Sequence, residues 1–586
     1  MATSKANIDR PVPTSVKIAE AELANMSTPI CRFPTEVLAN IFMHCNTNYP
    51  VFVEGNRAKG TITLFRLARI CRYWREIALD TPELWAQPDF SFGAPLARTM
   101  LKRSKDVALV LDAELDKNTK AVLLEALRDA LSRLTVLDLT ATENRADLED
   151  VLHVLTQPAP FLHTLGLDLD FDPWHGAGVR NLQFTEIPLP YAFLGDHSPR
   201  LKNLLLRRCY IPLDSPILTN VTRLSLDTLM WHPTDAYQLI ESLRELTHLE
   251  VLEVRNPFQG GRGAAQNSGG RVHLPHIRYI RLDELDSSGA ACFLEHISLP
   301  NSPILVVNGR LPPDDSPAEL IRFITSLSKT FSSQADPKLG AIEPIRSMHV
   351  GYYQVYGWIR ETLPPEYPFI RREHIGLPPP DLRVHVGFAT TFDTSSSDPS
   401  YLAGLLSTFP SLGHLRSLQI HVTETTASTI SSAEVSQEDS SYTISPSLED
   451  FAACFGGLPV LETVRLKGEL APLLMRVFGS AFDALLTLEL RSVLQSRIIP
   501  QVGSRIREIM ADVATSRTTS GVGMLKTLNL VQCEGVHASD VRQLEGIIAQ
   551  VDWDHWEEKE YGFDIQVEDT GESSGSPLYV PSIVVQ

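Results

Sequence analysis

A short apolar pattern, L-x-x-L-x-L with Val, Ile or Met as occasional replacements, recurs along most of this chain. Its copies begin at residues 134, 162, 201, 221, 249, 277, 345, 415, 461, 485 and 525. Three intervals are 28 residues long, whereas others are irregular, such as the 39 residues between 162 and 201. A recurring period of this length indicates repeated units that stack on one another and share one continuous core.

Segments with helical periodicity separate these copies. Apolar residues recur at three- and four-residue spacing in 234–246, 316–327 and 540–551, and two of these segments begin with a capping Thr or Ser. A strand followed by a helix, repeated, requires parallel strands with right-handed crossovers. We therefore expect an irregular α/β solenoid with strands on its concave face. The pattern resembles that of leucine-rich repeats, and Cys209 and Cys533 occupy the additional cysteine position of that family.

The same pattern predicts which residues line the concave face. Side chains alternate along a strand, so the residue after the third apolar position faces outward. In successive copies this residue is Asp168, Arg207, Asp227, Arg255 and Asp283, so the charge changes sign from strand to strand. We favour a self-neutralising ladder, because surface ion pairs contribute little. The alternative is a strip that binds a target protein through Arg207, Arg223, Arg255, Tyr279 and Arg281. An additional strand near 179–184 would interrupt the ladder.

The first ninety residues have a different pattern. In CRFPTEVLANIF, Pro34 suits the first position of a helix, and Val37, Leu38, Ile41 and Phe42 form an apolar stripe. A gap with Pro and Gly follows at 46–63. A second stripe then comprises Leu64, Leu67, Ile70, Cys71, Trp74 and Ile77. A module of two or three short helices cannot bury so many large apolar residues, so some should face a partner.

These blocks, FPTEVLANIF, LARICRYWREIA and TPELW, resemble the F-box in content and order. TPELW is typical of F-box proteins from mushroom-forming fungi. The resemblance implies a small helical module that binds a Skp-family adaptor and, through it, a cullin scaffold. It assigns adaptor-contacting or module-core roles to ten residues: Phe33, Pro34, Val37, Leu38, Ile41, Phe42, Leu67, Ile70, Cys71 and Trp74. Adaptor binding predicts exposed edges on Leu38, Ile41, Phe42 and Trp74.

Two departures from the F-box pattern leave an alternative open. Phe33 stands where Leu is usual, and the gap between the first two blocks is longer than in the compact form. The alternative for this segment is a helical hairpin that only caps the next domain.

Composition limits the class of partner. The formal net charge of -19 argues against general binding to nucleic acid or anionic membranes. The seven cysteines are scattered without a CxxC pair, so we expect no disulfide framework and no zinc site. We find neither a signal-peptide pattern nor an apolar run long enough to span a bilayer, and we expect a cytoplasmic or nuclear protein.

The expected organisation has four parts. Residues 1–30 form a partly disordered N-terminal segment, 31–90 the F-box-like module, 105–560 the repeat domain and 561–586 an acidic tail, in which FDIQV and LYVPSIVV could each add a strand. Loop insertions are expected near 256–272, which is rich in Gly, and 423–447, which is rich in Ser and Thr.

No HExxH, GxSxG, GxGxxG or Walker sequence is present. Asp552, Asp554, His555, Glu557 and Glu558 form an acidic group, which we interpret as a solvated helix end. We therefore expect no catalytic residue, metal or cofactor. The main hypothesis is a substrate receptor of a cullin-based, SCF-type ubiquitin ligase with an unknown target protein. The alternatives are a repeat scaffold with a vestigial F-box and an enzyme whose motif has diverged.

Overall fold

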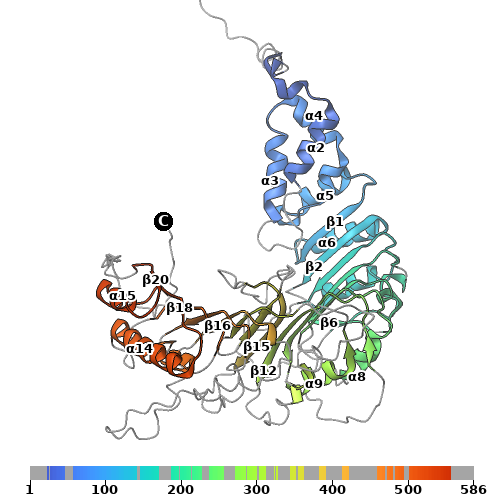
Figure 1. Ribbon diagram of the computed structural model, residues 1–586. Helices are drawn as coiled ribbons and strands as arrows, with labels where there is room; N and C mark the ends of the chain where they lie inside the picture. The colour runs from blue at the N-terminus through green and yellow to red at the C-terminus, as the bar shows by residue number, and fades with distance from the viewer. Residues whose placement is uncertain are drawn as a thin grey trace, which may run out of the picture.

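The computed structural model describes residues 23–25, 27–46, 57–141, 145–169, 187–196, 198–212, 214–227, 236–255, 271–285, 287–299, 303–311, 322–323, 325–327, 344–350, 354–361, 382–390, 412–421, 458–468, 471–479, 482–493 and 501–555. A helical module stands at the N-terminal end of one long curved sheet (Figure 1). Four predicted features lie outside the described residues: the strand near 179–184, most of the 256–272 insertion, the 423–447 insertion and the 561–586 tail.

The main sheet contains sixteen described strands. Every pair of neighbours is parallel, except that β14 runs antiparallel to both β13 and β15. In spatial order the strands are β1 (Leu109–Leu115), β2 (Leu134–Ala141), β3 (Thr164–Asp168), β5 (Asn203–Arg207), β7 (Arg223–Asp227), β8 (Val251–Arg255), β10 (Tyr279–Leu285), β12 (Ile304–Leu311), β15 (Leu382–Thr390), β14 (Gln354–Trp358), β13 (Ser347–Val350), β16 (Ser417–His421), β17 (Thr463–Lys467), β18 (Thr487–Arg491), β19 (Thr527–Val531) and β20 (Gln550–Trp553).

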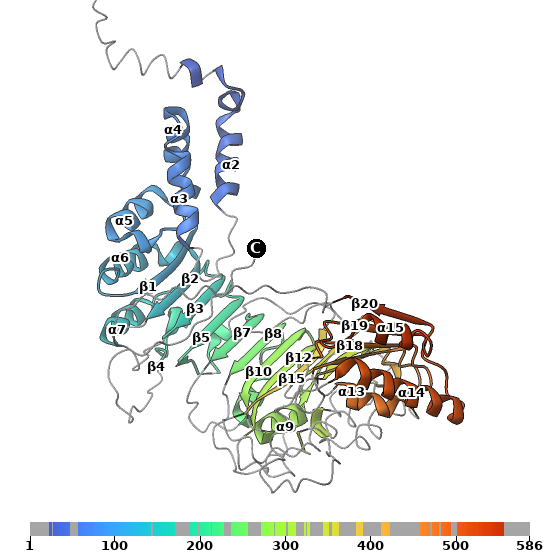
Figure 2. The ribbon, with the colours of Figure 1, turned by 90° about the vertical axis from the view of Figure 1, so that its left-hand side faces the viewer.

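Helices and short strand pairs cover the outer, convex face of this sheet (Figure 2). The helices are α6 (Lys120–Ala130), α7 (Arg145–Val154), α8 (Ala236–Leu243), α9 (Ser287–His296), α13 (Ala471–Leu474), α14 (Val502–Ser520) and α15 (Ala538–Leu544). The 3-10 turns are η3 (Phe90–Phe92), η4 (Leu131–Arg133), η6 (Phe193–Asp196), η7 (Pro216–Leu218), η9 (Leu412–His414) and η12 (Met475–Gly479). The strand pairs are β4 (Ile187–Pro188) with β6 (Cys209–Tyr210), and β9 (Val272–His273) with β11 (Ile297–Ser298). The predicted α/β architecture, helical module first and repeat-like sheet second, is confirmed.

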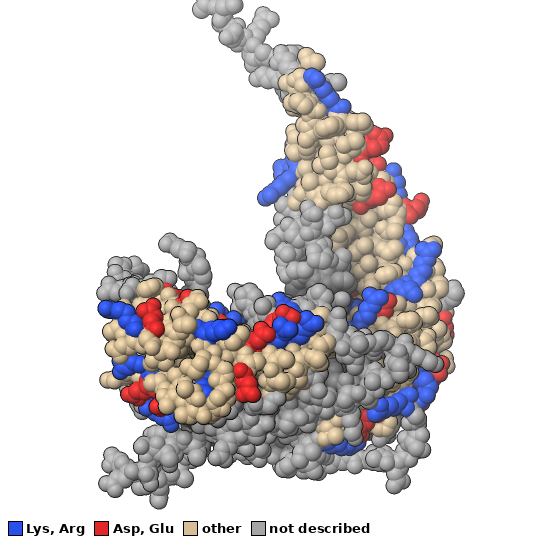
Figure 3. All heavy atoms as spheres, in the orientation of Figure 1, with Lys and Arg blue, Asp and Glu red and all other residues tan. Residues whose placement is uncertain are grey.

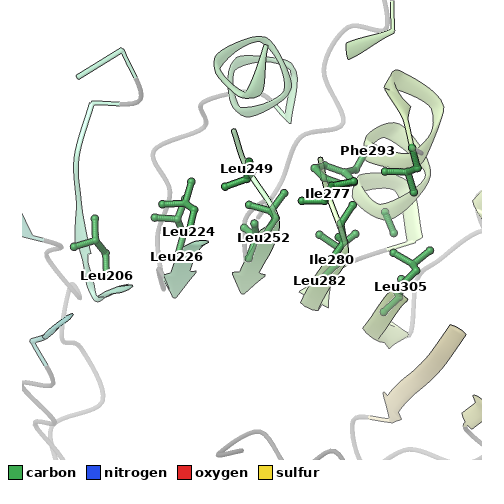
Figure 4. Close-up of a cluster of buried hydrophobic side chains, with 14 of the residues drawn as sticks. Leu206, Leu224, Leu226, Leu249, Leu252, Ile277, Ile280, Leu282, Phe293 and Leu305 are labelled. Carbon is green, nitrogen blue, oxygen red and sulfur yellow. The ribbon is translucent and has the colours of Figure 1, made fainter. Parts of the chain in front are cut away.

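The leucine pattern forms the core between sheet and helices. The second and third apolar positions of all eleven copies lie on strands of the main sheet. On β7 and β8, Leu224 pairs with Leu252 and Leu226 with Val254, so equivalent side chains stack in line. Figure 4 shows this row pointing toward the helices together with Phe293 of α9. Burial of each such side chain contributes roughly 1.5–3 kcal/mol, so the row is the main stabilising feature of the sheet.

Several elements differ from the sequence prediction. The strands β1, β12, β14, β15 and β20 carry no copy of the pattern that we recognised, and the antiparallel β14 departs from a purely parallel array. The helix predicted over 540–551 ends at Leu544, and Gln550 instead pairs with Thr527 of β19. The helix over 234–246 is described as α8, and that over 316–327 is described only at 322–323 and 325–327.

A left-handed residue turns the chain after three of the strands. Arg208, Ser492 and Gln532 follow β5, β18 and β19 with φ of 55°, 49° and 54°. The next residue in each case is buried, and two of these residues are the predicted additional cysteines. The Cys533 thiol donates a hydrogen bond to the Leu490 carbonyl on the neighbouring strand (3.5 Å). These cysteines therefore hold the corner between strand and outer segment.

Helix α5 (Ala94–Arg103) joins the N-terminal module to the sheet. Its Met100 lies in the core of the module, whereas its Ala97 lies in the core of the sheet. The Val110 N–H of β1 donates to the Ala86 carbonyl (3.0 Å), and Asp89 forms a bridge with Asp112. The module thus covers the first edge of the sheet through a packed junction.

We predict that Gly503→Ala destabilises the C-terminal repeats. A Cβ at this position would lie 2.5 Å from Asp540 Oδ2 and 2.7 Å from the Gly535 carbonyl oxygen. The Asp540 carboxylate also accepts the His537 N–H (3.1 Å), so it does not move away freely. The expected loss in the free energy of unfolding is about 1–3 kcal/mol, measured by urea denaturation. Gly413→Ala, where a Cβ meets nothing within 4 Å, is the control. Equal effects of both substitutions would contradict this packing.

Burial raises the pKa of the Cys533 thiol from 9.0 to about 12. Because the unfolded thiol ionises first, its stabilising effect is complete below pH 9 and is lost as the pH rises toward 12. We predict that the intact chain loses about 1 kcal/mol more stability between pH 8 and pH 10 than a Cys533→Ala variant. Urea denaturation at both pH values measures the difference, and parallel pH profiles would disprove the prediction.

Candidate protein-binding surfaces

The N-terminal module consists of η1 (Pro29–Arg32), α2 (Thr35–Asn46), α3 (Arg57–Leu67), α4 (Arg72–Asp80) and η2 (Pro82–Trp85). The predicted gap at 46–63 is too long, because α3 begins at Arg57. The second apolar stripe is not one helix either. The chain turns at 68–70, and Cys71 takes an extended conformation as the N-cap of α4, where its sulfur accepts the Trp74 N–H (3.5 Å). This cap explains the place of a cysteine three residues before the tryptophan.

Large side chains from all parts of the module meet in its core. The rings of Phe42 and Trp74 lie 5.0 Å apart at a tilted angle, beside the fully buried Leu38. The Trp85 indole N–H donates to the Ala78 carbonyl (2.7 Å), and the Arg103 guanidinium of α5 lies 4.4 Å from the Trp85 ring centre. The TPELW segment therefore closes the module and ties it to α5.

Among the described side chains of the module, four large apolar residues besides Ile30 of η1 (41% exposed) remain on the surface. The exposed fractions of Phe33, Val37, Ile41 and Ile70 are 47%, 40%, 37% and 58%. Val37 and Ile41 are four residues apart on α2, so their side chains lie one above the other. The Phe33 carbonyl accepts a hydrogen bond from the Tyr73 hydroxyl (3.3 Å), which ties the start of α2 to α4. We call these four residues the exposed apolar row.

The ten residues assigned by resemblance thus fall into three groups. Pro34 is exposed along with the exposed apolar row, Leu67 and Cys71 are half-buried, and Leu38, Phe42 and Trp74 are buried. The prediction of exposed edges was right for Ile41 and wrong for Leu38, Phe42 and Trp74. The physical reason is that the apolar stripe of α2 spans two faces. Residues at 38 and 42 turn toward α4, and their neighbours at 37 and 41 point about 100° away around the helix.

Ion pairs connect the first four residues of the predicted charge ladder, from Asp168 to Arg255, whereas the fifth residue, Asp283, pairs with Arg281 of its own strand. Arg207 lies 3.0 Å from the Asp168 carboxylate and 3.5 Å from that of Asp227, and Arg255 lies 3.0 Å from Asp227. Burial acts to lower the pKa of Arg207, but the hydrogen bond and charge of Asp168 and the charge of Asp227 outweigh it and raise that pKa. Figure 3 shows a different part of the surface, the outer edge of the molecule, where acidic and basic side chains also lie next to one another. Neighbouring strands in this half of the sheet neutralise each other.

The other candidates for target binding lie deeper. Arg223 pairs with Glu253 at 3.1 Å and is half-buried. Tyr279 and Arg281 are buried, and Arg281 lies 2.8 Å from the Asp283 carboxylate. Burial raises the pKa of Tyr279. Of the five predicted residues, three therefore reach the concave surface, and the other two lie beneath it.

The described residues contain no group of three or more His, Cys, Asp or Glu side chains placed to hold a metal ion. Within the same residues, no helix has the length and hydropathy to cross a membrane. Of the acidic group near the C-terminus, Asp552 lies on β20 and Asp554 and His555 follow it, so the expected helix end is wrong for these residues, whereas Glu557 and Glu558 lie outside the described residues. The Asp554 carboxylate accepts the Gln532 N–H (2.8 Å), and that of Asp552 accepts the Gln550 side-chain amide (3.0 Å). Both carboxylates thus have structural partners.

Comparison with known proteins adds one family assignment. Residues 30–91 match the family model described as F-box-like. No protein with a curated description matches the chain. Among solved structures, the chain is similar to an internalin from Listeria monocytogenes, with 13% identity over 78% of this chain and 88% of that one and a TM-score of 0.22. A likeness at that score carries no argument, so the repeat architecture rests on the strand pairing described above. The chain accordingly contains an F-box-like domain at residues 30–91, which is followed by a mainly parallel, repeat-like α/β sheet.

Proposed function

We propose that this chain is the substrate receptor of a cullin-based, SCF-type ubiquitin ligase. Its F-box-like domain would bind a Skp-family adaptor, and the concave face of its sheet would bind a target protein. The observation that carries this proposal is the exposed apolar row on an otherwise well-packed module. Large apolar side chains that stay exposed on a small domain typically mark a protein-binding site.

The geometry of this row suits a groove on a partner. Val37 and Ile41 present one side of α2, and Phe33 and Ile70 extend the same apolar character to the turns that precede α2 and α4. An amphipathic helix placed in an apolar groove uses residues at this spacing as anchors. The buried Phe42–Trp74 pair supports α2 from behind, which keeps the anchors in place before binding.

The packed junction at α5 gives the receptor a mechanical role. Because Ala97 and Met100 lie in the two adjoining cores, a target on the sheet would stand at a fixed position relative to the adaptor. A ubiquitin ligase of this type gains rate by holding the target near a ubiquitin-charged enzyme. This role requires no catalytic residue, metal or cofactor in the receptor, and we place it in the cytoplasm or the nucleus.

For the target side, we propose the concave face of the first half of the sheet. Arg207, Arg223 and Arg255 are the residues that reach its surface. The buried Tyr279 and Arg281 would act indirectly, by holding Asp283 and the adjoining strands in register. Since each of the three arginines already has a carboxylate partner, we expect them to fix orientation rather than to supply most of the affinity.

We predict that the double substitution Val37→Asp/Ile41→Asp abolishes co-purification of the full chain with a Skp-family adaptor. Two charges on the apolar row would have to be buried in the partner's groove, and the expected loss in affinity is about 100-fold or more. Because both side chains are exposed, we expect little change in the thermal midpoint of the chain. Leu38→Asp is unsuitable for this test, because Leu38 is fully buried and its replacement would unfold the module.

The matched control is Val460→Asp/Leu486→Asp. Both residues are 37% exposed and lie in the segments just before β17 and β18, far from the module in sequence, so this variant should bind the adaptor as the unmodified chain does. Unchanged binding by the Val37→Asp/Ile41→Asp variant would refute the proposed contact surface. Absence of binding by the unmodified, folded chain would favour a repeat scaffold with a vestigial F-box.

A further inference from the structure

The sign alternation of the concave face breaks down on β17 and β18. Lys467 and Arg491 occupy the position after the third apolar residue and stand directly opposite one another. At the same position, strands β3 to β10 carry Asp168, Arg207, Asp227, Arg255 and Asp283 in alternating sign. Like charges directly opposite each other in a sheet are destabilising, so these two strands lack the compensation found in the first half.

Strands β17 and β18 carry a single carboxylate, that of Glu489, and two arginines share it. Glu489 Oε1 lies 2.7 Å from Arg465 Nε and 3.2 Å from Arg491 Nε, and this carboxylate is nearly buried. Neither of these nitrogens is aligned for a hydrogen bond to that oxygen. The Lys467 ammonium has neither an ion pair nor a hydrogen bond with any residue that the structure describes. One acidic and three basic side chains thus lie together on the concave surface.

From this arrangement we infer that Lys467, Arg491 and Arg465, which we call the basic site, bind an acidic peptide segment of the target protein. Side-chain carboxylates of the peptide would replace the missing alternate charges of the ladder. The guanidinium of Arg491, which is one-third exposed, offers hydrogen-bond donors arranged to match a carboxylate. The half-buried Thr463 and Thr487 stand opposite one another four residues before Lys467 and Arg491, and their hydroxyls would add polar contacts along the same strands.

The surroundings of the basic site favour a short acidic peptide over a nucleic acid. Asp552 and Asp554 are exposed on and just after β20, two strands beyond β18, which places them on the order of 10 Å away. A continuous polyanion that crossed the concave face would meet these carboxylates, whereas a local group of acidic residues need not. The net charge of -19 over the whole chain also opposes a long polyanion.

The inference rests on the proposed function, because it names the chemistry of the target, but its test does not involve the adaptor. We would measure fluorescence anisotropy of a short labelled peptide of alternating Glu and Ser with the full chain. The expected result is saturable binding that weakens with salt. Lys467→Glu/Arg491→Glu should weaken it about tenfold or more, since both attractions become repulsions. The control Lys102→Glu/Arg128→Glu changes the net charge equally on α5 and α6 and should alter binding less than about twofold.

Three outcomes would overturn the inference. They are equal affinity of the Lys467→Glu/Arg491→Glu variant, no peptide binding by the folded unmodified chain, and tighter binding of a single-stranded oligothymidylate than of the acidic peptide. If the charge reversal unfolds the chain, Lys467→Gln/Arg491→Gln removes the attraction without adding a carboxylate and should still weaken binding. Failure here leaves adaptor binding unaffected, and failure of adaptor binding leaves the peptide measurement intact, so the two claims are separable.

Discussion

Leu224, Leu252 and Ile280 lie side by side on β7, β8 and β10, and Leu226, Val254 and Leu282 form the next row. This in-register contact between neighbouring parallel strands supports the rest of the molecule. It requires the inward residues of every strand to be apolar, and it thereby places the residues between them on the concave face. The outer helices then cover the leucine rows from the other side, as Phe293 of α9 does.

As a consequence, alternate residues of each strand serve two different purposes, packing and recognition. Apolar positions are committed to packing, so all recognition chemistry must come from the intervening residues. In the first half of the sheet these residues form ion pairs with one another, as in the Asp168–Arg207–Asp227–Arg255 ladder. On β17 and β18 the charges are not balanced in this way, because Lys467 and Arg491 stand opposite one another and the one carboxylate, that of Glu489, lies beside Arg465 and Arg491. The module at the other end repeats this division on a helix, where Phe42 is buried and Ile41 is exposed.

Much of this organisation was predictable from the sequence. The leucine pattern identified eleven strands and their inward positions, and alternation along each strand identified the ladder. The strands β1 and β20 were missed because the edge strands of a repeat array need not carry its sequence pattern. The strand β14 was missed because it runs antiparallel to its neighbours and so does not belong to the repeating strand–helix unit. In the module, apolar spacing showed that α2 has an apolar stripe but did not distinguish Leu38 from Val37. That distinction depends on where α4 lies. Helix α4 begins after its N-cap, Cys71, which stands within the second apolar stripe of the sequence.

The central claim is that the exposed apolar row is the contact surface for an adaptor. Amide hydrogen exchange of the full chain, with and without a Skp-family adaptor, tests it most directly. We predict slower exchange on adaptor binding at residues 33–41 and 68–71, and no change on β17 and β18. Slower exchange confined to the repeat sheet, with the module unchanged, would contradict it.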